Sequence, residues 1–342
     1  MRVSMYYNNH DVRLEEMPIP QTGRGELLVR IEACGICGSD VMEWYRIHKA
    51  PLVLGHEIAG VIVEVGEGVA GYQAGQRVSA SHHVPCNTCR YCLSGHHTVC
   101  DTLRRTSFDP GGFAEYVRLP AINVDRGVYP LPDSVSFAEA TFIEPLACVL
   151  RGQRRAGLEP GQSVLVIGSG IAGALHISLA RALGAGQVLA TDVTDYRLEA
   201  ARRFGADVAL HAPEATPARL RQANDGRLAD LVVVCTGALP AIEQALRSVE
   251  RGGKVLFFAP TSPGVTIPFS LNDVMWGNDV TLTTSYAGSP ADHLAALELI
   301  RARRLPVARM ITHCLGLAET GLGFRLVAEA GASLKVIVQP QR

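Results

Sequence analysis

Short runs of hydrophobic and β-branched residues, broken by glycine, characterise the first part of the chain. They occur at 26–35, 58–66, 75–81 and 111–120, as ELLVRIEACG, IAGVIVEVG, GQRVSAS and GGFAEYVRLP. Short runs of this kind, bounded by turn residues, are typical of β-strands. The pattern therefore predicts a β-rich region over residues 1 to about 147.

The pattern changes near residue 137. The segment 136–157, SFAEATFIEPLACVLRGQRRAG, has helical spacing and opens with a serine that can cap a helix. From residue 163 onward, apolar runs alternate with helical stretches of 10–15 residues, which predicts βαβ units and a parallel sheet. We expect strands at 163–168, 187–192, 231–237, 254–259 and 280–288, and helices at 171–185, 195–206 and 239–253.

The last part of the chain, 288–342, contains two helical segments and a final strand at 334–340. The sequence thus predicts an α/β protein with two domains. A β-rich domain comprises residues 1–147 and 288–342, and a doubly wound dinucleotide-binding domain, residues 148–287, is inserted into it.

Charge and apolar stretches exclude several classes of protein. The formal net charge of the 342 residues is −1, which favours neither nucleic acid nor an anionic membrane surface as a partner. The first residues, MRVSMYYNNHDVRL, lack the apolar core of a secretory signal, and no run of about 20 apolar residues is present. We therefore expect a cytoplasmic protein whose cysteines are reduced.

Four of the nine cysteines fall within fifteen residues, as C-x2-C-x2-C-x7-C. Cys86, Cys89, Cys92 and Cys100 can complete a tetrahedral zinc site with no open position, so this zinc would be structural and not catalytic. His96 or His97 in place of one cysteine, two disulfides and an iron–sulfur cluster are the alternatives. The spacing favours a structural zinc lobe over 86–100.

A glycine-rich motif, VIGSGIAG, provides Gly168, Gly170 and Gly173 as G-x-G-x-x-G between an expected strand and an expected helix. The first glycine permits a tight turn, the second permits close approach of a pyrophosphate, and the third permits close packing of helix on strand. The helix N-terminus then faces the phosphates. This context predicts a dinucleotide site.

An acidic residue follows at the expected distance. Asp192 ends the second strand of this domain and can accept hydrogen bonds from the ribose hydroxyls while repelling a 2′-phosphate, which favours NAD over NADP. Arg197 either flanks the adenosine or is an ordinary surface arginine, and an arginine there can also hold a 2′-phosphate.

Candidate ligands for a second metal come from three separate segments. A catalytic zinc keeps three protein ligands and one open position. Cys34-x2-Cys37 lacks the sequence context of a thioredoxin-like redox pair, and a lone cysteine is often a buried filler. The candidates are Cys34 and Cys37 in CGICGSD, His56 and Glu57 in LGHEIAG, and Glu144 and Cys148 in FIEPLAC.

Taken together, these segments resemble the zinc-dependent medium-chain alcohol dehydrogenases. The resemblance rests on GICGSD, GHEIAGVIVEVG, GQRV, the four-cysteine lobe, GGFAEYV, EPLA and VIGSGIAG, which occur in the family's order and cover almost the whole chain. It is strongest to the polyol branch, which includes sorbitol, threonine and cyclitol dehydrogenases. The resemblance implies a GroES-like catalytic domain and a Rossmann domain that binds NAD.

The resemblance also implies roles for single residues. Cys37, and not Cys34, would be the thiolate ligand of the catalytic zinc, with His56 as the imidazole ligand and Glu144 as the third. Glu57 would lie beside the metal, bound directly or through water. Ser39 matches the hydroxyl that connects the substrate oxygen to solvent.

Two positions depart from the pattern of the family. Many relatives have a histidine at the end of the proton relay where this chain has Met42, so the relay must end in water or in another group. Sorbitol dehydrogenases have an arginine that contacts the polyol where this chain has Ser285 in TTSYAG.

We therefore expect a dehydrogenase with two zinc ions per chain that transfers hydride between NAD and a secondary alcohol of a sugar alcohol, cyclitol or aminocyclitol. A threonine-type amino-alcohol dehydrogenase and a non-enzymatic NAD- and zinc-binding protein are the alternatives. The segment 264–270, GVTIPFS, is expected to be a strand that extends the sheet edge. Exposed sheet edges tend to pair, so we expect a homo-oligomer, a tetramer by resemblance or else a dimer.

Overall fold

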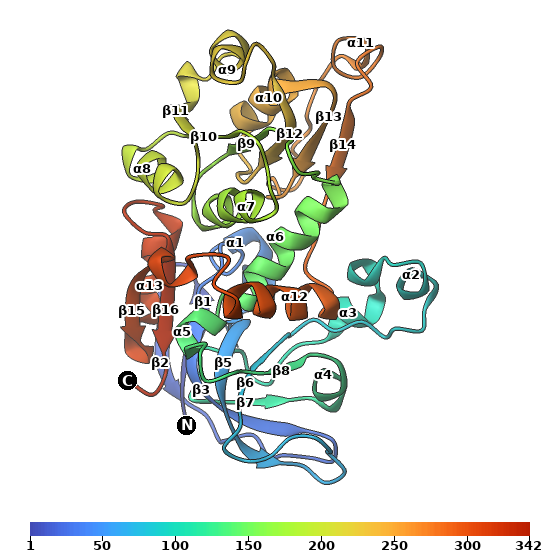
Figure 1. The fold of residues 1–342 in the computed structure, drawn as a ribbon. Helices are drawn as coiled ribbons and strands as arrows, with labels where there is room; N and C mark the ends of the chain where they lie inside the picture. Colours follow the sequence, from blue (N-terminus) through green and yellow to red (C-terminus); the bar gives the residue numbers. More distant parts are fainter. The chain divides into compact units, whose positions relative to one another are not determined.

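The computed structural model describes the whole chain, residues 1–342. It divides into two compact units, one formed by Met1–Ala147 with Ala287–Arg342 and the other by Cys148–Tyr286. The long helix α6 (Ile143–Ala156) begins in the first unit and ends in the second (Figure 1). None of the helices combines the length and the apolar character needed to cross a membrane.

Two β-sheets form the framework of the first unit. Its strands are β1 (Arg2–Asn8), β2 (Asp11–Glu16), β3 (Leu27–Gly35), β4 (Leu52–Val53), β5 (Glu57–Val65), β6 (Arg77–Ala80), β7 (Tyr116–Leu119), β8 (Val128–Pro130), β15 (Ile311–Gly316) and β16 (Lys335–Gln339). The larger sheet has the order β15-β16-β3-β5-β6-β8, with β7 paired to β3, and the smaller has the order β2-β1-β4. β3 pairs antiparallel with both β5 and β16. The central strand thereby connects segments about 300 residues apart in sequence.

Short helices and loops complete the first unit. They are α1 (Glu43–Arg46), α2 (Arg90–Leu93), α3 (Asp101–Arg105), α4 (Ala121–Arg126), α5 (Phe137–Ala140), α12 (Pro290–Arg301) and α13 (Thr320–Ala328). The serine expected to cap a helix does so: Ser136 forms a capping box with Glu139 at the start of α5. Ser289 and Asp292 form another at the start of α12. Both predicted helical segments of the C-terminal part are confirmed.

A single parallel sheet forms the framework of the second unit. Its strands are β9 (Val164–Ile167), β10 (Val188–Asp192), β11 (Val208–His211), β12 (Ala229–Val234), β13 (Val249–Phe257) and β14 (Thr281–Thr284), and its further helices are α7 (Ile171–Ala182), α8 (Asp195–Arg203), α9 (Pro217–Ala223), α10 (Leu239–Ser248) and α11 (Leu271–Val274). In the order β11-β10-β9-β12-β13-β14 all strands are parallel. Successive strands of the chain are added on one side of β9 as far as β11, and then on its other side, starting with β12. Ligands of such sheets bind at this change of side, beyond the carboxyl ends of the strands.

Two sequence-based predictions about this unit are wrong. The helix expected to reach residue 253 ends at Ser248, because Val249 already pairs with Ala229 and starts β13. The expected strand at 264–270 does not form, and the edge of the sheet is β14. Pro268 within the segment cannot donate a ladder hydrogen bond, which disfavours a strand.

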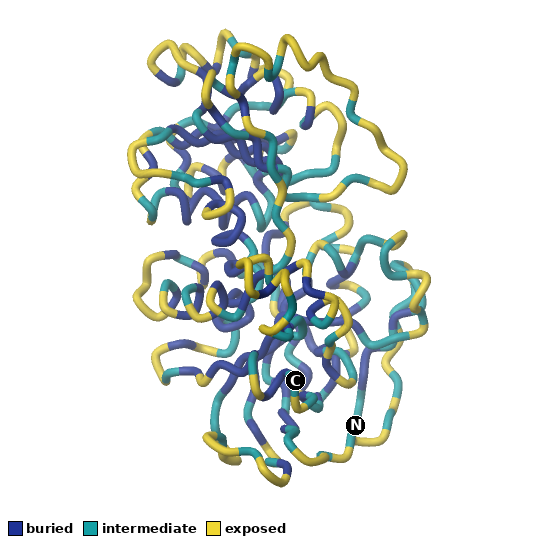
Figure 2. Tube along the Cα trace, turned by 90° about the vertical axis from the view of Figure 1, so that its right-hand side faces the viewer, coloured by how far each residue is buried: buried dark blue, intermediate teal, exposed yellow.

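Hydrophobic residues fill the interior of each unit (Figure 2). In the first unit, the core includes Val29, Ile31 and Ile58 of the central strands and Phe113 and Phe324 from the surrounding segments. In the second unit, separate clusters cover the two faces of the parallel sheet. The side chains that carry chemistry are therefore attached to well-packed strands.

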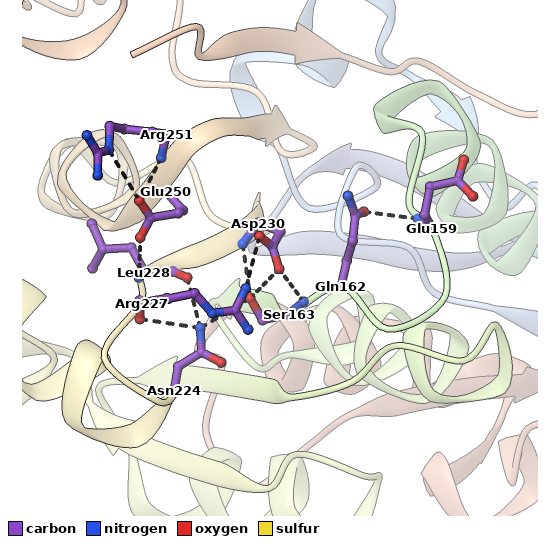
Figure 3. Close-up of polar contacts among 9 residues, drawn as sticks. All are labelled: Glu159, Gln162, Ser163, Asn224, Arg227, Leu228, Asp230, Glu250 and Arg251. Atoms are coloured by element: carbon purple, nitrogen blue, oxygen red, sulfur yellow. Dashed lines mark hydrogen bonds and ion pairs between the residues drawn. The ribbon is translucent and has the colours of Figure 1, made fainter.

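A polar network holds the amino ends of β9 and β12 together in the second unit (Figure 3). The Asp230 carboxylate accepts from the backbone N–H and hydroxyl of Ser163 at 2.7 and 2.8 Å. Asn224 donates to the Ser163 hydroxyl at 3.2 Å and to the Leu228 carbonyl at 2.8 Å, while Glu250 accepts from the Leu228 N–H at 2.8 Å. This network satisfies backbone groups at the edge opposite the glycine motif.

Candidate active site

The four cysteines of the lobe bring their sulfur atoms together. The Sγ–Sγ distances are 3.6 Å for Cys89–Cys92 and for Cys86–Cys100, and 4.0 Å for Cys86–Cys92. None of these residues forms a disulfide. Four sulfurs at about 2.3 Å from a tetrahedral zinc lie about 3.8 Å apart. The lobe therefore fits a zinc ion, and His96 and His97 remain outside the group.

Backbone N–H groups of the lobe point at the sulfurs. Cys89 and Thr88 donate to Cys86 Sγ at 3.2 and 3.5 Å, and the Cys86 N–H donates to Cys100 Sγ at 3.4 Å. Hydrogen bonds from Thr88 and Cys89 lower the pKa of Cys86 to about 5. Because the thiolate is the form that binds metals, these hydrogen bonds favour the metal-binding form of Cys86.

A second group of potential ligands lies at one end of β3 and β5. Cys37 follows β3, His56 precedes β5 and Glu57 begins β5, and the ligand atoms of these three residues lie within 4.8 Å of one another. His56 is 8% exposed and Glu57 is 1% exposed, whereas Cys37 is half-buried. Gly35 pairs with Glu57 across the ladder, which fixes how close the two segments come. A thiol, an imidazole and a carboxylate form a donor set that suits zinc.

Asp40 contacts two of the candidate ligands, Cys37 and His56. One of its carboxylate oxygens accepts from the Cys37 N–H at 3.0 Å, and the other lies 3.4 Å from His56 Nδ1. Burial would lower the pKa of His56, but the Asp40 carboxylate outweighs burial and raises that pKa well above its ordinary value. With Nδ1 engaged by a carboxylate, Nε2 is the ring nitrogen left for a metal, the arrangement that orients metal-binding histidines in general.

Lys335 forms a buried ion pair with Glu57, and both side chains are 1% exposed. The pair reaches across β3, and a Cβ at Gly35 would lie 2.6 Å from Lys335 Nζ and would overlap the Glu57 carboxylate. A side chain at this position would therefore displace the ion pair. Burial raises the pKa of Glu57 overall, against the opposing charge of Lys335. Lys335 is not among the residues predicted from the sequence. The signal for it is a lysine at the start of an otherwise apolar strand.

Glu144 lies in the first turn of α6 and stays outside the group formed by Cys37, His56 and Glu57. Its charge is nevertheless close enough to contribute to the raised pKa of Glu57. Cys34 is fully buried, and Gly55 and Gly112 approach its sulfur so closely that a Cβ on either would lie 2.9 or 2.7 Å away. Cys34 therefore belongs to the core and not to the candidate metal site.

Ser39 lies next to the candidate ligands. Its backbone N–H donates to Cys37 Sγ at 3.4 Å. Its hydroxyl accepts from Arg46, a residue that the sequence analysis did not single out. His82 and His83 were also missed: the His82 ring is 4.7 Å from His56 and 3.8 Å from His83. Burial lowers the pKa of His83 to about 3, so this ring is neutral. The pair HH in SASHHVPC was the available signal.

The glycine motif connects β9 to α7 in the second unit. Gly168 has a φ of +90°, which L side chains rarely adopt. A Cβ at Gly173 would overlap the Gly168 carbonyl, whereas Gly170 has open space out to the Arg197 guanidinium at 3.7 Å. The loop is thus tight at its first and third glycines and open at its second, and it lies where the strand order reverses.

Asp192 ends β10 beside this loop and is 5% exposed. One carboxylate oxygen accepts from the Ser169 N–H at 2.7 Å, and the other accepts from the N–H groups of Val193 and Thr194 at 2.7 and 3.1 Å. Arg197 Nε is buried without a hydrogen-bond partner. Asp192 therefore helps to shape the loop, and Arg197 has a donor left for an anionic ligand.

Comparisons with known proteins agree with this arrangement. Residues 23–133 match the alcohol dehydrogenase GroES-like domain, and residues 172–302 match the zinc-binding dehydrogenase domain. The chain is 31% identical to a sorbitol dehydrogenase of Gallus gallus, covering 96% of the chain and 93% of the relative. It is 30% identical to a protein of Aspergillus clavatus named "Probable D-xylulose reductase A", covering 96% of the chain and 94% of the relative.

A solved structure of a zinc-binding dehydrogenase from Sinorhizobium meliloti, bound to NADP, superposes with a TM-score of 0.87 at 27% identity and covers 99% of both chains. Identity, coverage and fold all point in the same direction as the two ligand groups and the glycine loop. The chain belongs to the zinc-binding alcohol dehydrogenase family and is an oxidoreductase that acts on CH–OH groups.

Proposed function

We propose that the chain oxidises a secondary alcohol of a polyhydroxylated substrate with NAD, and that Cys37, His56 and Glu144 hold the catalytic zinc with Glu57 beside it. The observation that carries this proposal is the close grouping of Cys37, His56 and Glu57, with Ser39 bonded to the same thiol. Glu144 supplies the remaining carboxylate. A second zinc occupies the lobe formed by Cys86, Cys89, Cys92 and Cys100, which gives two zinc ions per chain.

The nicotinamide cofactor binds at the glycine loop. Gly168 and Gly173 shape the turn, Gly170 leaves room for the pyrophosphate, and the amino end of α7 favours its charge. Asp192 accepts from three backbone N–H groups and, over a longer 3.4 Å, from the Thr194 hydroxyl, and the ribose hydroxyls would take the place of this weakest contact. Its negative charge opposes a 2′-phosphate, so NAD is preferred, while Arg197 contributes a donor for the phosphates or the adenosine.

When bound, zinc and NAD supply a Lewis acid for the substrate oxygen and an acceptor for hydride. The chain's own residues orient the ligands and stabilise the charge on the substrate oxygen. Asp40 orients His56 and fixes the Cys37 backbone. Ser39 donates a hydrogen bond to the substrate oxygen and stabilises the negative charge that develops on it when the alcohol loses its proton. The Lys335–Glu57 pair keeps a carboxylate in a fixed place beside the ligands.

The substrate class is supported by the relatives, which are named for sorbitol and D-xylulose. A carboxylate ligand in place of a thiolate makes the metal site harder and better suited to oxygen-rich substrates. Ser285 stands where sorbitol dehydrogenases have a polyol-binding arginine, so a cyclitol, an aminocyclitol or a different sugar alcohol is favoured over sorbitol itself.

Steady-state turnover across a panel of substrates tests this proposal. The panel contains sorbitol, xylitol, inositols, aminocyclitols and L-threonine, each with NAD and with NADP. We expect the highest kcat/KM for a cyclitol or sugar alcohol with NAD. Oxidation of L-threonine alone would replace the polyol with an amino alcohol, and absence of NAD reduction with every member of the panel would contradict the proposed reaction.

We further propose that the chain is cytoplasmic and forms a homo-oligomer, a tetramer in preference to a dimer. None of the nine cysteines forms a disulfide, which is compatible with a reducing compartment. Phe269, Leu271 and Trp276, in the segment before β14, are 42%, 60% and 77% exposed, an apolar surface that self-association would cover. Light scattering at micromolar concentration is the measurement, and a monomer would contradict the proposal.

A further inference from the structure

Arg46 holds Ser39 at two points. Its Nε donates to the Ser39 carbonyl at 3.0 Å, and its Nη2 donates to the Ser39 hydroxyl at 3.0 Å. Together with the bond from the Ser39 N–H to Cys37 Sγ at 3.4 Å, these contacts fix the serine on three sides. The hydrogen of the Ser39 hydroxyl is left to donate elsewhere.

The charge of Arg46 is anchored by the residue that supports the candidate ligands. Its Nη2 lies 3.4 Å from Asp40, whose side chain is fully buried and also contacts His56. The Arg46 side chain is 14% exposed and its guanidinium lies 4.6 Å from the centre of the Tyr45 ring. Arg46 is therefore a fixed part of the site and not a mobile surface side chain.

A guanidinium donates hydrogen bonds, accepts none, and does not release a proton at the pH values at which enzymes work. A proton that enters the Ser39 hydroxyl therefore cannot leave through Arg46. This differs from the relay of relatives, which ends in a histidine that can accept a proton, at the position of Met42 here. In a relay the serine hydroxyl would pass its proton on to the next group. Here Arg46 donates a hydrogen bond to the Ser39 hydroxyl, and that hydroxyl is left to donate toward the substrate.

We propose that Arg46 is a positioning residue that commits Ser39 to donate to the substrate oxygen, in place of a relay that carries the proton away. The inference rests on the proposed function, in which Ser39 contacts the substrate. Donation from a charged group polarises the serine hydroxyl and makes it a stronger donor. Arg46 thereby helps to stabilise the negative charge that develops on the substrate oxygen, and the proton of the alcohol passes to solvent water and not through Ser39.

Neighbouring charged groups determine how strongly the charge of Arg46 acts on the substrate oxygen. Asp40 partly neutralises it, so the effect on the substrate oxygen is smaller than that of an isolated cation. The titratable and charged groups that interact with Arg46 itself are Tyr6, Asp40, Tyr45, His82 and His83. Asp40 also interacts with Cys34, Cys37 and His56, and Lys49 lies over the Tyr45 ring.

The experiment compares Arg46→Met and Arg46→Lys with the wild type. For Arg46→Met we expect kcat/KM for alcohol oxidation at pH 7 to fall by roughly tenfold, and the rising limb of its pH profile to move up by about one pH unit, since one unit corresponds to tenfold in an equilibrium constant. Arg46→Lys keeps the charge but cannot clamp two oxygens in one plane, so we expect about half of the shift.

Arg13→Met is the matched control. Arg13 also lies over a tyrosine ring, at 4.5 Å from the centre of Tyr7, and also pairs with an aspartate, Asp11, at 2.7 Å. It makes no contact with Ser39. Its replacement should leave both kcat/KM and the pH profile unchanged.

An equilibrium measurement supplements turnover. Calorimetry of 2,2,2-trifluoroethanol, an alcohol that resists oxidation, is performed on zinc-loaded protein with NAD across pH 6–10. Arg46→Met should move the pH at which binding tightens upward by about one unit. In a Ser39→Ala background, the same replacement should cause little further shift, because Arg46 acts through the serine.

An unchanged pH profile in folded Arg46→Met protein with wild-type zinc content would overturn the proposal, and so would a full shift that persists in the Ser39→Ala background. A change in KM alone would also overturn it, since it would make Arg46 a substrate contact. If the wild type binds no trifluoroethanol in the presence of NAD, the proposed function itself is wrong and the role of Arg46 fails with it.

Discussion

The cysteine lobe and the Cys37 group are built in opposite ways, although both offer donors for zinc. The four lobe cysteines come from fifteen consecutive residues, and their apolar surroundings within the lobe amount to Leu103 and the cysteines themselves. The Cys37 group lies at the ends of β3 and β5, next to the core residues Ile36 and Ile58, and is supported by Lys335 of β16, nearly 300 positions away. On the proposed assignment the lobe would depend on its metal, whereas strand pairing positions the Cys37 group.

This difference predicts a different role for each of the two proposed zinc ions. A site whose ligands come from one loop gains its order from the metal, so zinc there supplies folding free energy. A site whose ligands are attached to paired strands, with Asp40 and Lys335 supporting them, is ordered before the metal arrives and can keep a position open for substrate. The predictions below test this contrast, from the largest expected effect to the smallest.

Glu144→Ala should give the largest change in activity. It removes the third proposed ligand from α6 while the strands that carry Cys37 and His56 remain intact. We expect kcat to fall by roughly a thousandfold or more, because zinc is lost or misplaced and the developing charge is no longer supported. The thermal midpoint should change by only about 2 °C. The measurements are kcat, zinc content and thermal midpoint, and near-normal turnover would remove Glu144 from the ligand set.

Cys92→Ser should show the reverse pattern. Cys92 is 5% exposed and its sulfur lies 3.6 Å from that of Cys89, so loss of this thiolate opens the lobe. We expect a loss of roughly 4 kcal/mol in the free energy of unfolding and a lower midpoint, together with one zinc fewer per chain. Turnover of the protein that remains folded should stay within about threefold of the wild type. Abolished turnover in folded, fully assembled protein would contradict a structural role for the lobe.

Lys335→Met tests whether the Cys37 group is ordered by the fold. It leaves the Glu57 carboxylate buried and unpaired, which should cost about 3 kcal/mol in the free energy of unfolding at pH 8. The pKa of Glu57 is already raised by burial, so its folded pKa lies above the unfolded value, and stability from this group is lost as pH rises. Loss of the lysine raises that pKa further.

The deficit of Lys335→Met should therefore shrink as pH falls from 8 toward 5, because Glu57 takes up a proton in the folded protein. Urea unfolding of both proteins at several pH values measures the difference. Lys49→Met, which removes an exposed lysine, is the control and should show no such dependence. A deficit that is constant with pH would mean that the pair does not depend on the Glu57 charge.

Asp192→Ala lies outside both ligand groups and should leave zinc content unchanged. We expect the ratio of kcat/KM for NAD to that for NADP to fall by about 10- to 100-fold, because the charge that opposes a 2′-phosphate is gone. KM for both cofactors should also rise, since the Ser169 N–H loses its partner. Asp192→Asn separates the effects, as it keeps an acceptor for the loop and removes the charge. A wild-type preference for NADP would contradict the assignment.

Sites formed by one segment of the chain could be predicted from the sequence, whereas contacts between distant segments could not. The lobe and the glycine loop depend on spacing within one segment, so their residues could be named and their elements placed. Lys335 and Arg46 could not be assigned, because their roles arise from strand register and from the short helix α1, whose last residue donates back to Ser39. The apolar residues of the segment 264–270 predict a strand that does not form. The sequence does not show that this segment lacks a strand to pair with.

Cys148→Ala is expected to have the smallest effect and is the most direct test of the third ligand. Cys148 follows Glu144 by one turn on α6, so the two side chains lie on the same side of the helix. In the type of site that uses two cysteines and one histidine, a thiolate would take the place that we give to Glu144. If the carboxylate is the ligand, Cys148→Ala should change kcat less than twofold and leave both zinc ions in place. Loss of turnover in Cys148→Ala, combined with activity in Glu144→Ala, would assign the metal to the thiol and make the site a softer one.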